Sequence, residues 1–277
     1  TGVYMIPSPR LIFWEVTKTC NLSCPHCRAS AVITRSPETL NFLECAKFID
    51  DAAKSFPRTI LVISGGEPLM REDIFDIITH STKKGLMTVM ASNATMITPH
   101  VAARLKTAGI RKIAVSVYGA DAKSHDSFIG EKGAFNLTMQ GIKNFRAEGI
   151  KFQMNATVTK MNMDNIGKMA KFAEASGADS FHIFFLVPTG RGKQMTGDEM
   201  TPQEYEQAFN GIWNVSKEVK IKLKVTCAPH FYRLVRARAS QGIVSEQIDP
   251  ASKGCLAGTG VCFVSHRGEV YPCGYMQ

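Results

Sequence analysis

Short β-rich runs alternate with longer amphipathic stretches along most of this 277-residue chain. The expected strands are residues 11–16, 59–64, 86–91, 112–117, 151–158 and 180–187, and the expected helices are residues 38–55, 71–84, 98–108, 136–148 and 162–176. Glycines stand where four of these helices should stop, as is typical of helix ends: Gly85, Gly109, Gly149 and Gly177. This rhythm predicts six βα units that share one parallel sheet.

Three cysteines follow the first expected strand in the motif Cys-Asn-Leu-Ser-Cys-Pro-His-Cys, namely Cys20, Cys24 and Cys27. An iron–sulfur cube is normally held by four protein thiolates, so three would leave one iron open to a non-protein ligand. The alternative is a tetrahedral zinc site made by these cysteines and His26. Zinc would leave unexplained the sequence Gly-Gly-Glu-Pro that follows the second expected strand.

The cysteine motif, followed by Gly65-Gly66-Glu67-Pro68, resembles the radical S-adenosylmethionine (radical SAM) enzymes. The resemblance implies an α/β fold, a partial (β/α)6 TIM-like barrel, in which Cys20, Cys24 and Cys27 hold a catalytic 4Fe-4S cluster. S-adenosylmethionine binds the open iron in that family and is cleaved to a 5′-deoxyadenosyl radical. Both motifs fall on loops after strands, where parallel barrels carry their reactive groups.

The resemblance also implies which residues contact S-adenosylmethionine. Gly65 and Gly66 allow a close approach of the backbone, while Glu67 and Pro68 shape the turn. Further expected contacts lie at later strands: Asn93, Ser116 and Asn155. Each of these three can instead cap a helix or bond locally to the backbone.

Two positions depart from the pattern of many relatives. Tyr118 stands where aspartate is usual, and Ile129-Gly130 replaces a frequent Arg-Gly. The groups that those usual side chains contact must therefore be contacted in another way here.

A second cysteine group follows a further expected helix, residues 202–219, and a short strand, residues 220–225. Cys255, Cys262 and Cys273 are similar to the start of the auxiliary-cluster module called SPASM or twitch, and residues 261–271 read as a β-hairpin. The expected domains are a barrel over residues 1–225 and a C-terminal auxiliary-cluster module over residues 226–277. The remainder of the full SPASM pattern is missing, either by biology or by trimming. Three sulfurs fall short of an auxiliary 4Fe-4S cluster, so Cys227, a residue beyond Gln277 or substrate must complete it; zinc and unligated thiols are the alternatives.

The net charge of +9 favours an anionic partner. No RNA-binding signature is present, so nucleic acid is not the expected partner. Arg191 and Lys193 follow the sixth expected strand and are the candidates to clamp substrate carboxylates, with solvated loop charges as the alternative.

The resemblance narrows to the haem-biosynthesis group of radical SAM enzymes at residues 14–20, 187–192, 227–230 and 254–262. It implies oxidative decarboxylation of tetrapyrrole propionates, from iron-coproporphyrin III to haem, with flavodoxin or ferredoxin as electron donor. The auxiliary cluster would accept the electron left on the substrate. The alternatives are a sister enzyme that removes acetate or propionate groups, a peptide-modifying SPASM enzyme, and a non-enzymatic electron carrier.

No apolar run approaches the roughly 20 residues that span a bilayer, and the start lacks the pattern of a signal peptide. The expected location is the cytoplasm, without membrane contact. Eight cysteines in a reducing compartment favour metal ligation over disulfides. Cys45 is expected to be a buried apolar side chain, and His80, His100, His125 and His182 carry no expected catalytic role.

Overall fold

A computed structural model describes residues 8–252 and 254–277. Its strands form one nine-stranded sheet in the order β7-β6-β5-β4-β3-β2-β1-β8-β9. Their bounds are β1 Leu11–Glu15, β2 Ile60–Ser64, β3 Met87–Ser92, β4 Lys112–Ser116, β5 Lys151–Val158, β6 Ser180–Phe185, β7 Lys222–Thr226, β8 Val261–Val264 and β9 Val270–Tyr271.

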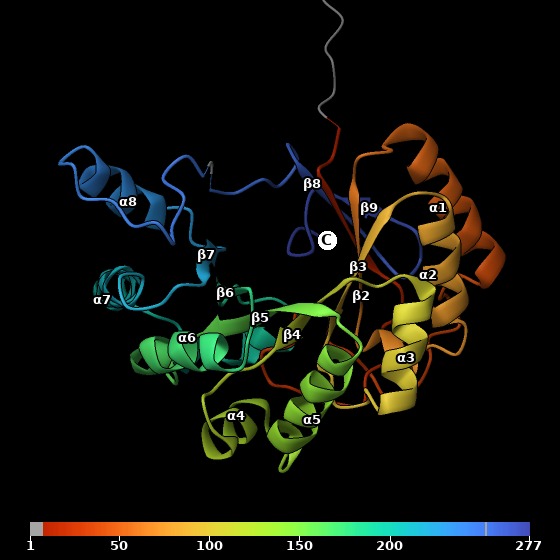
Figure 1. Ribbon diagram of the computed structural model, residues 1–277, viewed down its shortest axis with the longest axis horizontal. Coiled ribbons are helices and arrows are strands. Elements are labelled where there is room, and N and C mark those ends of the chain that lie inside the picture. Colours follow the sequence, from red (N-terminus) through yellow and green to blue (C-terminus); the bar gives the residue numbers. More distant parts are fainter. Residues whose placement is uncertain (1–7, 253) are drawn as a thin grey trace, which may run out of the picture.

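Helices follow the strands and lie on an arc outside the sheet (Figure 1). Their bounds are α1 Phe42–Ser55, α2 Ile74–Lys83, α3 Pro99–Ala108, α4 Ala122–Ile129, α5 Ala134–Ala147, α6 Ile166–Ala175, α7 Pro202–Val215 and α8 Phe231–Ala239. Within the described ranges, no helix is both long and apolar enough to cross a membrane.

Strands β1 to β7 are neighbours in sequence order and all pair in parallel. The parallel α/β fold predicted from the sequence is therefore confirmed. Because every one of these strands runs in the same direction, their carboxyl ends and the loops that follow gather along one edge of the sheet.

The two faces of the sheet differ in burial. Along β5, Phe152, Met154 and Ala156 are buried against the helical layer, whereas the alternating Gln153 and Asn155 remain partly exposed on the inner face. In a closed barrel, inward side chains fill the interior. Here the inner face carries polar groups that stay accessible.

Three helices differ from the sequence expectation. The α1 helix begins after Asn41, not at residues 37–38, because Asn41 and Glu44 form a reciprocal capping box. The α4 helix was not expected; Asp121 caps it by accepting from the backbone N–H of Ser124 at 2.8 Å. The α8 helix lies between the expected strand at residues 220–225 and Cys255, where the ranges given above include no helix.

The C-terminal hairpin joins the main sheet. Strand β8 pairs in parallel with β1, with Phe13 opposite Phe263, and β9 pairs antiparallel with β8. The expected division after residue 225 falls inside β7, and residues 1–7 of the expected first domain lie outside the described residues. The division into two domains stays a prediction.

Candidate cluster and cofactor site

The loop that carries Cys20, Cys24 and Cys27 lies between β1 and α1. The Cys20 backbone N–H donates to the carbonyl of Val32 at 2.8 Å. Two further backbone N–H groups point at sulfur: that of Leu22 is 3.4 Å from Cys20 Sγ, and that of Ala31 is 3.5 Å from Cys27 Sγ. Such donors stabilise negative charge on a thiolate.

The thiols of this loop lie in a site that disfavours isolated thiolates. Burial raises the pKa of Cys20 to about 11 and that of Cys24 to about 12. The charges of the neighbouring cysteines add to the rise in each pKa. Thiolates are therefore unfavourable here without a metal, although the N–H donors stabilise them. This combination fits an iron–sulfur cluster, because its irons supply the compensating positive charge.

Arg191 supports the cysteine loop instead of facing open space. Its backbone N–H donates to the Cys27 carbonyl at 3.0 Å, its Nε to the Cys24 carbonyl at 2.9 Å, and its Nη1 to the Ala31 carbonyl at 2.6 Å. The sequence predicted a clamp for substrate carboxylates here. The cysteine loop uses Nε and Nη1, while Nη2 has no hydrogen-bond partner among the described residues, so the clamp stays a prediction. Lys193 is exposed, and its role stays a prediction.

Gly65 and Gly66 pack against the segment that joins β1 to the cysteine motif. A Cβ on Gly65 would lie 2.5 Å from the carbonyl oxygen of Thr17, and one on Gly66 would overlap the Thr19 carbonyl. The backbone N–H groups of Gly66 and Glu67 donate to those same carbonyls, each at 2.8 Å. The glycines therefore allow a close approach between two chain segments, and their contact with S-adenosylmethionine stays a prediction.

Glu67 is fully buried and ties two loops together. Its carboxylate accepts from the Leu69 backbone N–H at 3.2 Å, the Asn93 backbone N–H at 2.8 Å and the Ser92 hydroxyl at 2.9 Å. Burial raises the pKa of Glu67 to about 7, although the backbone donors of Asn93 and Leu69 oppose that rise. Sequence reasoning did not identify Ser92 as a partner of Glu67.

Asn93 connects this carboxylate to the cysteine loop. Its side-chain amide donates to the side-chain oxygen of Asn21 at 2.9 Å and lies 4.0 Å from Cys20 Sγ. Asn93 therefore stands beside a predicted cluster ligand, and its contact with S-adenosylmethionine stays a prediction.

Ser116 and Asn155 belong to one row of inner-face side chains that crosses four strands. In register, Ser116 of β4 lies beside Asn155 of β5, which lies beside His182 of β6, which lies beside Lys224 of β7. Burial, then the charge of Lys224, lowers the pKa of His182 to about 3. His182 carried no expected role and Lys224 was not among the candidates, although the polar alternation of residues 151–158 indicates this face.

His26 lies among aromatic rings instead of pointing freely toward the cysteines. Its ring centroid is 4.4 Å from that of Tyr118 and 4.9 Å from that of Phe128. Burial lowers the pKa of His26 to about 3. In residues 8–252 and 254–277, no group of three or more His, Cys, Asp or Glu side chains is arranged to hold a metal ion. Ligands of a cube bind separate irons and stand farther apart than ligands of one ion.

The second cysteine group has Cys227 as one of the completing ligands that the sequence allowed. Burial raises the pKa of Cys227 to about 11, and the charges of Cys273 and Cys255 add to this rise. Cys262 lies beside Ile12 in register and packs against the main core, and burial is the cause that raises its pKa. Ligation of a second cluster by Cys255, Cys262 and Cys273, with Cys227 as a candidate to complete the set, stays a prediction.

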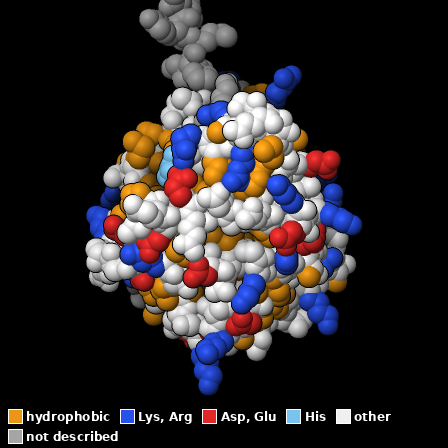
Figure 2. All heavy atoms as spheres, turned by 90° about the vertical axis from the view of Figure 1, so that its left-hand side faces the viewer, with side chains coloured by type: hydrophobic (Ala, Val, Ile, Leu, Met, Phe, Trp, Pro, Cys, Tyr) orange, Lys and Arg blue, Asp and Glu red, His pale blue; other side chains and the backbone are white. Residues whose placement is uncertain are grey.

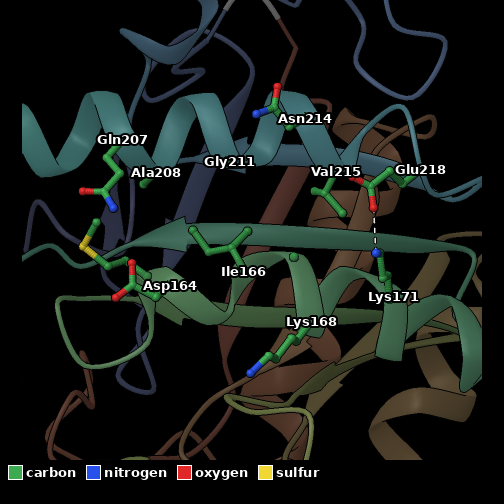
Figure 3. Close-up of a pocket in the computed structure, with 12 residues that line it drawn as sticks. Asp164, Ile166, Lys168, Lys171, Gln207, Ala208, Gly211, Asn214, Val215 and Glu218 are labelled. Carbon is green, nitrogen blue, oxygen red and sulfur yellow. Dashed lines mark ion pairs between the residues drawn. The ribbon is translucent and has the colours of Figure 1, made fainter.

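A groove of about 420 Å³ lies between α6 and α7, apart from the residues discussed above. Figure 3 shows polar side chains along it, and Lys171 pairs with Glu218 across it at 2.6 Å. None of the predicted site residues lines this groove. The face made by α6, α7 and α8 carries dispersed basic side chains among acidic ones (Figure 2).

Comparison with known proteins gives both sequence and fold matches. The family model described as the Radical SAM superfamily matches residues 14–173. An AdoMet-dependent heme synthase of Methanosarcina barkeri is 43% identical over 279 residues, which cover 99% of this chain and 79% of that protein. An Fe-coproporphyrin III synthase of the same organism is 30% identical over 94% of this chain and 67% of its own length.

Two solved structures share the fold. Streptococcus suis SuiB bound to its precursor peptide superposes with a TM-score of 0.72 at 18% identity, and the match covers 96% of this chain and 60% of SuiB. The anSMEcpe protein with bound AdoMet gives a TM-score of 0.73 at 16% identity, over 96% of this chain and 75% of that one. This chain therefore spans less than two thirds of SuiB.

Proposed function

Because this chain belongs to the radical SAM superfamily, we propose that it decarboxylates propionate side chains of iron-coproporphyrin III to give haem. The protein is an enzyme that uses S-adenosylmethionine and a 4Fe-4S cluster, as the sequence predicted. The 43% identity to an AdoMet-dependent heme synthase over almost the whole chain carries the proposal.

Cys20, Cys24 and Cys27 would hold the catalytic cluster. When bound, the cluster and S-adenosylmethionine supply the radical chemistry of the family. The protein's own part is to stabilise the thiolates through the N–H donors of Leu22 and Ala31 and to hold their loop through Arg191.

The S-adenosylmethionine contacts expected from the sequence would line the edge of the sheet next to this loop. Asn93 stands beside Cys20, and Ser116 and Asn155 continue across the inner face. Gly65, Gly66, Glu67 and Pro68 would bring the loop after β2 to the same place.

The tetrapyrrole would lie over the inner face, where Lys224 is the candidate to meet a propionate. Desolvation by the surrounding protein, followed by the charge of Arg10, lowers the pKa of Lys224. An anionic substrate would offset both effects, because it supplies negative charge. Lys193 stays a second candidate.

A second 4Fe-4S cluster would be held in the C-terminal region. Cys255, Cys262 and Cys273 are the proposed ligands, and Cys227, whose pKa the charges of Cys255 and Cys273 raise beyond the effect of burial, is the candidate to complete the set. Such a cluster beside the substrate would take up the electron left by decarboxylation.

The proposed electron donor is a flavodoxin or ferredoxin, and the proposed location is the cytoplasm. All eight cysteines are free thiols, which suits a reducing compartment. Neither nucleic acid nor a membrane is a proposed partner.

The test is anaerobic incubation of the reconstituted protein with S-adenosylmethionine, reductant and either iron-coproporphyrin III or didecarboxysiroheme, followed by mass spectrometry. We expect the first substrate to lose carboxyl groups as 5′-deoxyadenosine forms. The variant with Cys20, Cys24 and Cys27 replaced by alanine should be inactive, and Cys45→Ser, which changes a buried cysteine outside both groups, should be active.

Two outcomes count against the proposal. Turnover of didecarboxysiroheme alone would assign the chain to a sister enzyme of the haem pathways. Cleavage of S-adenosylmethionine that no tetrapyrrole stimulates would favour a peptide-modifying enzyme.

A further inference from the structure

Arg28 connects the two cysteine-bearing parts of the chain. It directly follows Cys27, and its Nη1 donates to the carbonyl of Gly274, the residue after Cys273, at 3.0 Å. Its Nη2 pairs with Glu15 of β1 at 2.7 Å. One side chain therefore bonds at once to the first strand and to the C-terminal segment.

A buried carboxylate and an aromatic ring surround this guanidinium. Glu15 is 2% exposed and its other carboxylate oxygen lies 3.2 Å from Nδ1 of His266, in the loop that joins β8 to β9. The guanidinium carbon stands 4.6 Å from the centroid of the Phe263 ring. Cation and ring attract each other at this distance.

Gly274 permits this approach. A Cβ there would lie 3.2 Å from Nε of Arg28 and 3.1 Å from Cδ2 of Phe263, closer than side chains normally pack. The glycine, the ring and the two acceptors thus hold the guanidinium in one place. An arginine that binds substrate would keep its donors unpaired when substrate is absent. In contrast, Nη1 and Nη2 of Arg28 bond to protein groups.

We propose that Arg28 is a positioning residue that holds the Cys273 segment against the Cys20–Cys27 loop, and so fixes the second cluster site relative to the first. The contact itself is independent of the reaction. Only the statement about a second cluster rests on the proposed function.

The experiment compares Arg28→Met and Arg28→Lys with the parent holoenzyme. Amide hydrogen exchange is followed in peptides covering residues 258–277, and electron paramagnetic resonance is recorded on the reduced protein. Arg267→Met is the matched control. Arg267 lies on the β8–β9 hairpin that Arg28 contacts, but it pairs with Glu269 and Glu38 at the surface.

Loss of a charged hydrogen bond should speed exchange in residues 258–277 by about tenfold or more in Arg28→Met. The lysine variant should recover only part of this, because one ammonium does not reproduce the fork that reaches both Glu15 and Gly274. The resonance of the second cluster should change in both variants and stay unchanged in the control.

Should Arg28→Met fail to fold, Gly274→Ala gives the same test, since the methyl group displaces Arg28 without removing its charge. Exchange and resonance at parental values in the variants would overturn the proposal. A parent protein that lacks a second cluster would refute that part of the proposed function, while the exchange data would still decide the role of Arg28.

Discussion

At the scale of single residues, the protonation state of His125 is set by its burial. His125 is 2% exposed, and its Nδ1 accepts from the backbone N–H of Tyr118 at 3.2 Å. Burial lowers its pKa from 6.5 to about 4. Because the folded pKa is below the unfolded one, this histidine favours folding above pH 6.5, and the contribution is lost as the pH falls toward 4.

We predict that His125→Gln weakens the acid sensitivity of the fold. When the pH falls from 7 to 5, the buried neutral histidine should lower the free energy of unfolding of the parent by about 2 kcal/mol. Glutamine does not titrate, so His125→Gln should not show this loss. Urea unfolding of both proteins at the two pH values measures this difference. His100→Gln, at an exposed position, should behave like the parent; an equal acid loss in parent and His125→Gln would contradict the prediction.

Arg191 marks a limit of prediction at the same scale. The residue type and the loop after the sixth strand were predictable, and both suggested carboxylate binding. Which loop its side chain would meet was not, because the contacts to Cys24 and Ala31 join residues far apart in the chain.

We expect Arg191→Met to loosen the first cluster. Removing a support of the ligand loop should weaken iron binding by about tenfold, measured as faster iron release to a chelator. Lys193→Met changes the exposed neighbouring cation and should release iron at the parental rate. A higher KM for the tetrapyrrole with unchanged iron release in Arg191→Met would restore the carboxylate-clamp interpretation.

At the scale of elements, the loop after β2 depends on its glycines. Gly66→Ala would place a methyl group against the Thr19 carbonyl and separate the two hydrogen bonds beside it. We predict a loss of about 3 kcal/mol in the free energy of unfolding, measured by urea titration.

Gly211→Ala is the control for that experiment. Gly211 lies within α7, and a Cβ there would meet no atom within 4 Å. Alanine should therefore stabilise this helix by about 0.5–1 kcal/mol. A Gly66→Ala protein as stable as the parent would show that the loop can move away from Thr19.

The regular elements were predictable where local signals were strong. Gly109 ends α3 in the left-handed conformation, and Thr98 caps its start, as the sequence indicated. The short α4 helix was missed because it is only eight residues long and mostly polar, and it buries only His125, Phe128 and Ile129. Its packing, which local sequence does not reveal, stabilises it.

At the scale of the whole molecule, the βα rhythm predicted the parallel sheet, but nothing in it revealed where the C-terminal hairpin would pair. Strand β8 lies beside β1, almost the full described chain away. The same pairing brings Gly274 to Arg28 and the second cysteine group toward the first. Non-local pairing of this kind depends on tertiary packing that local patterns do not encode.

The position of β8 has a consequence for synthesis. On the ribosome, β1 emerges first and finds β2 early, but its other edge has no partner until residues 261–264 have been made. Arg28 likewise waits for Gly274. We therefore infer that the nascent cysteine loop forms its contact with the C-terminal segment late. The iron centre would then be completed only after the hairpin has been translated.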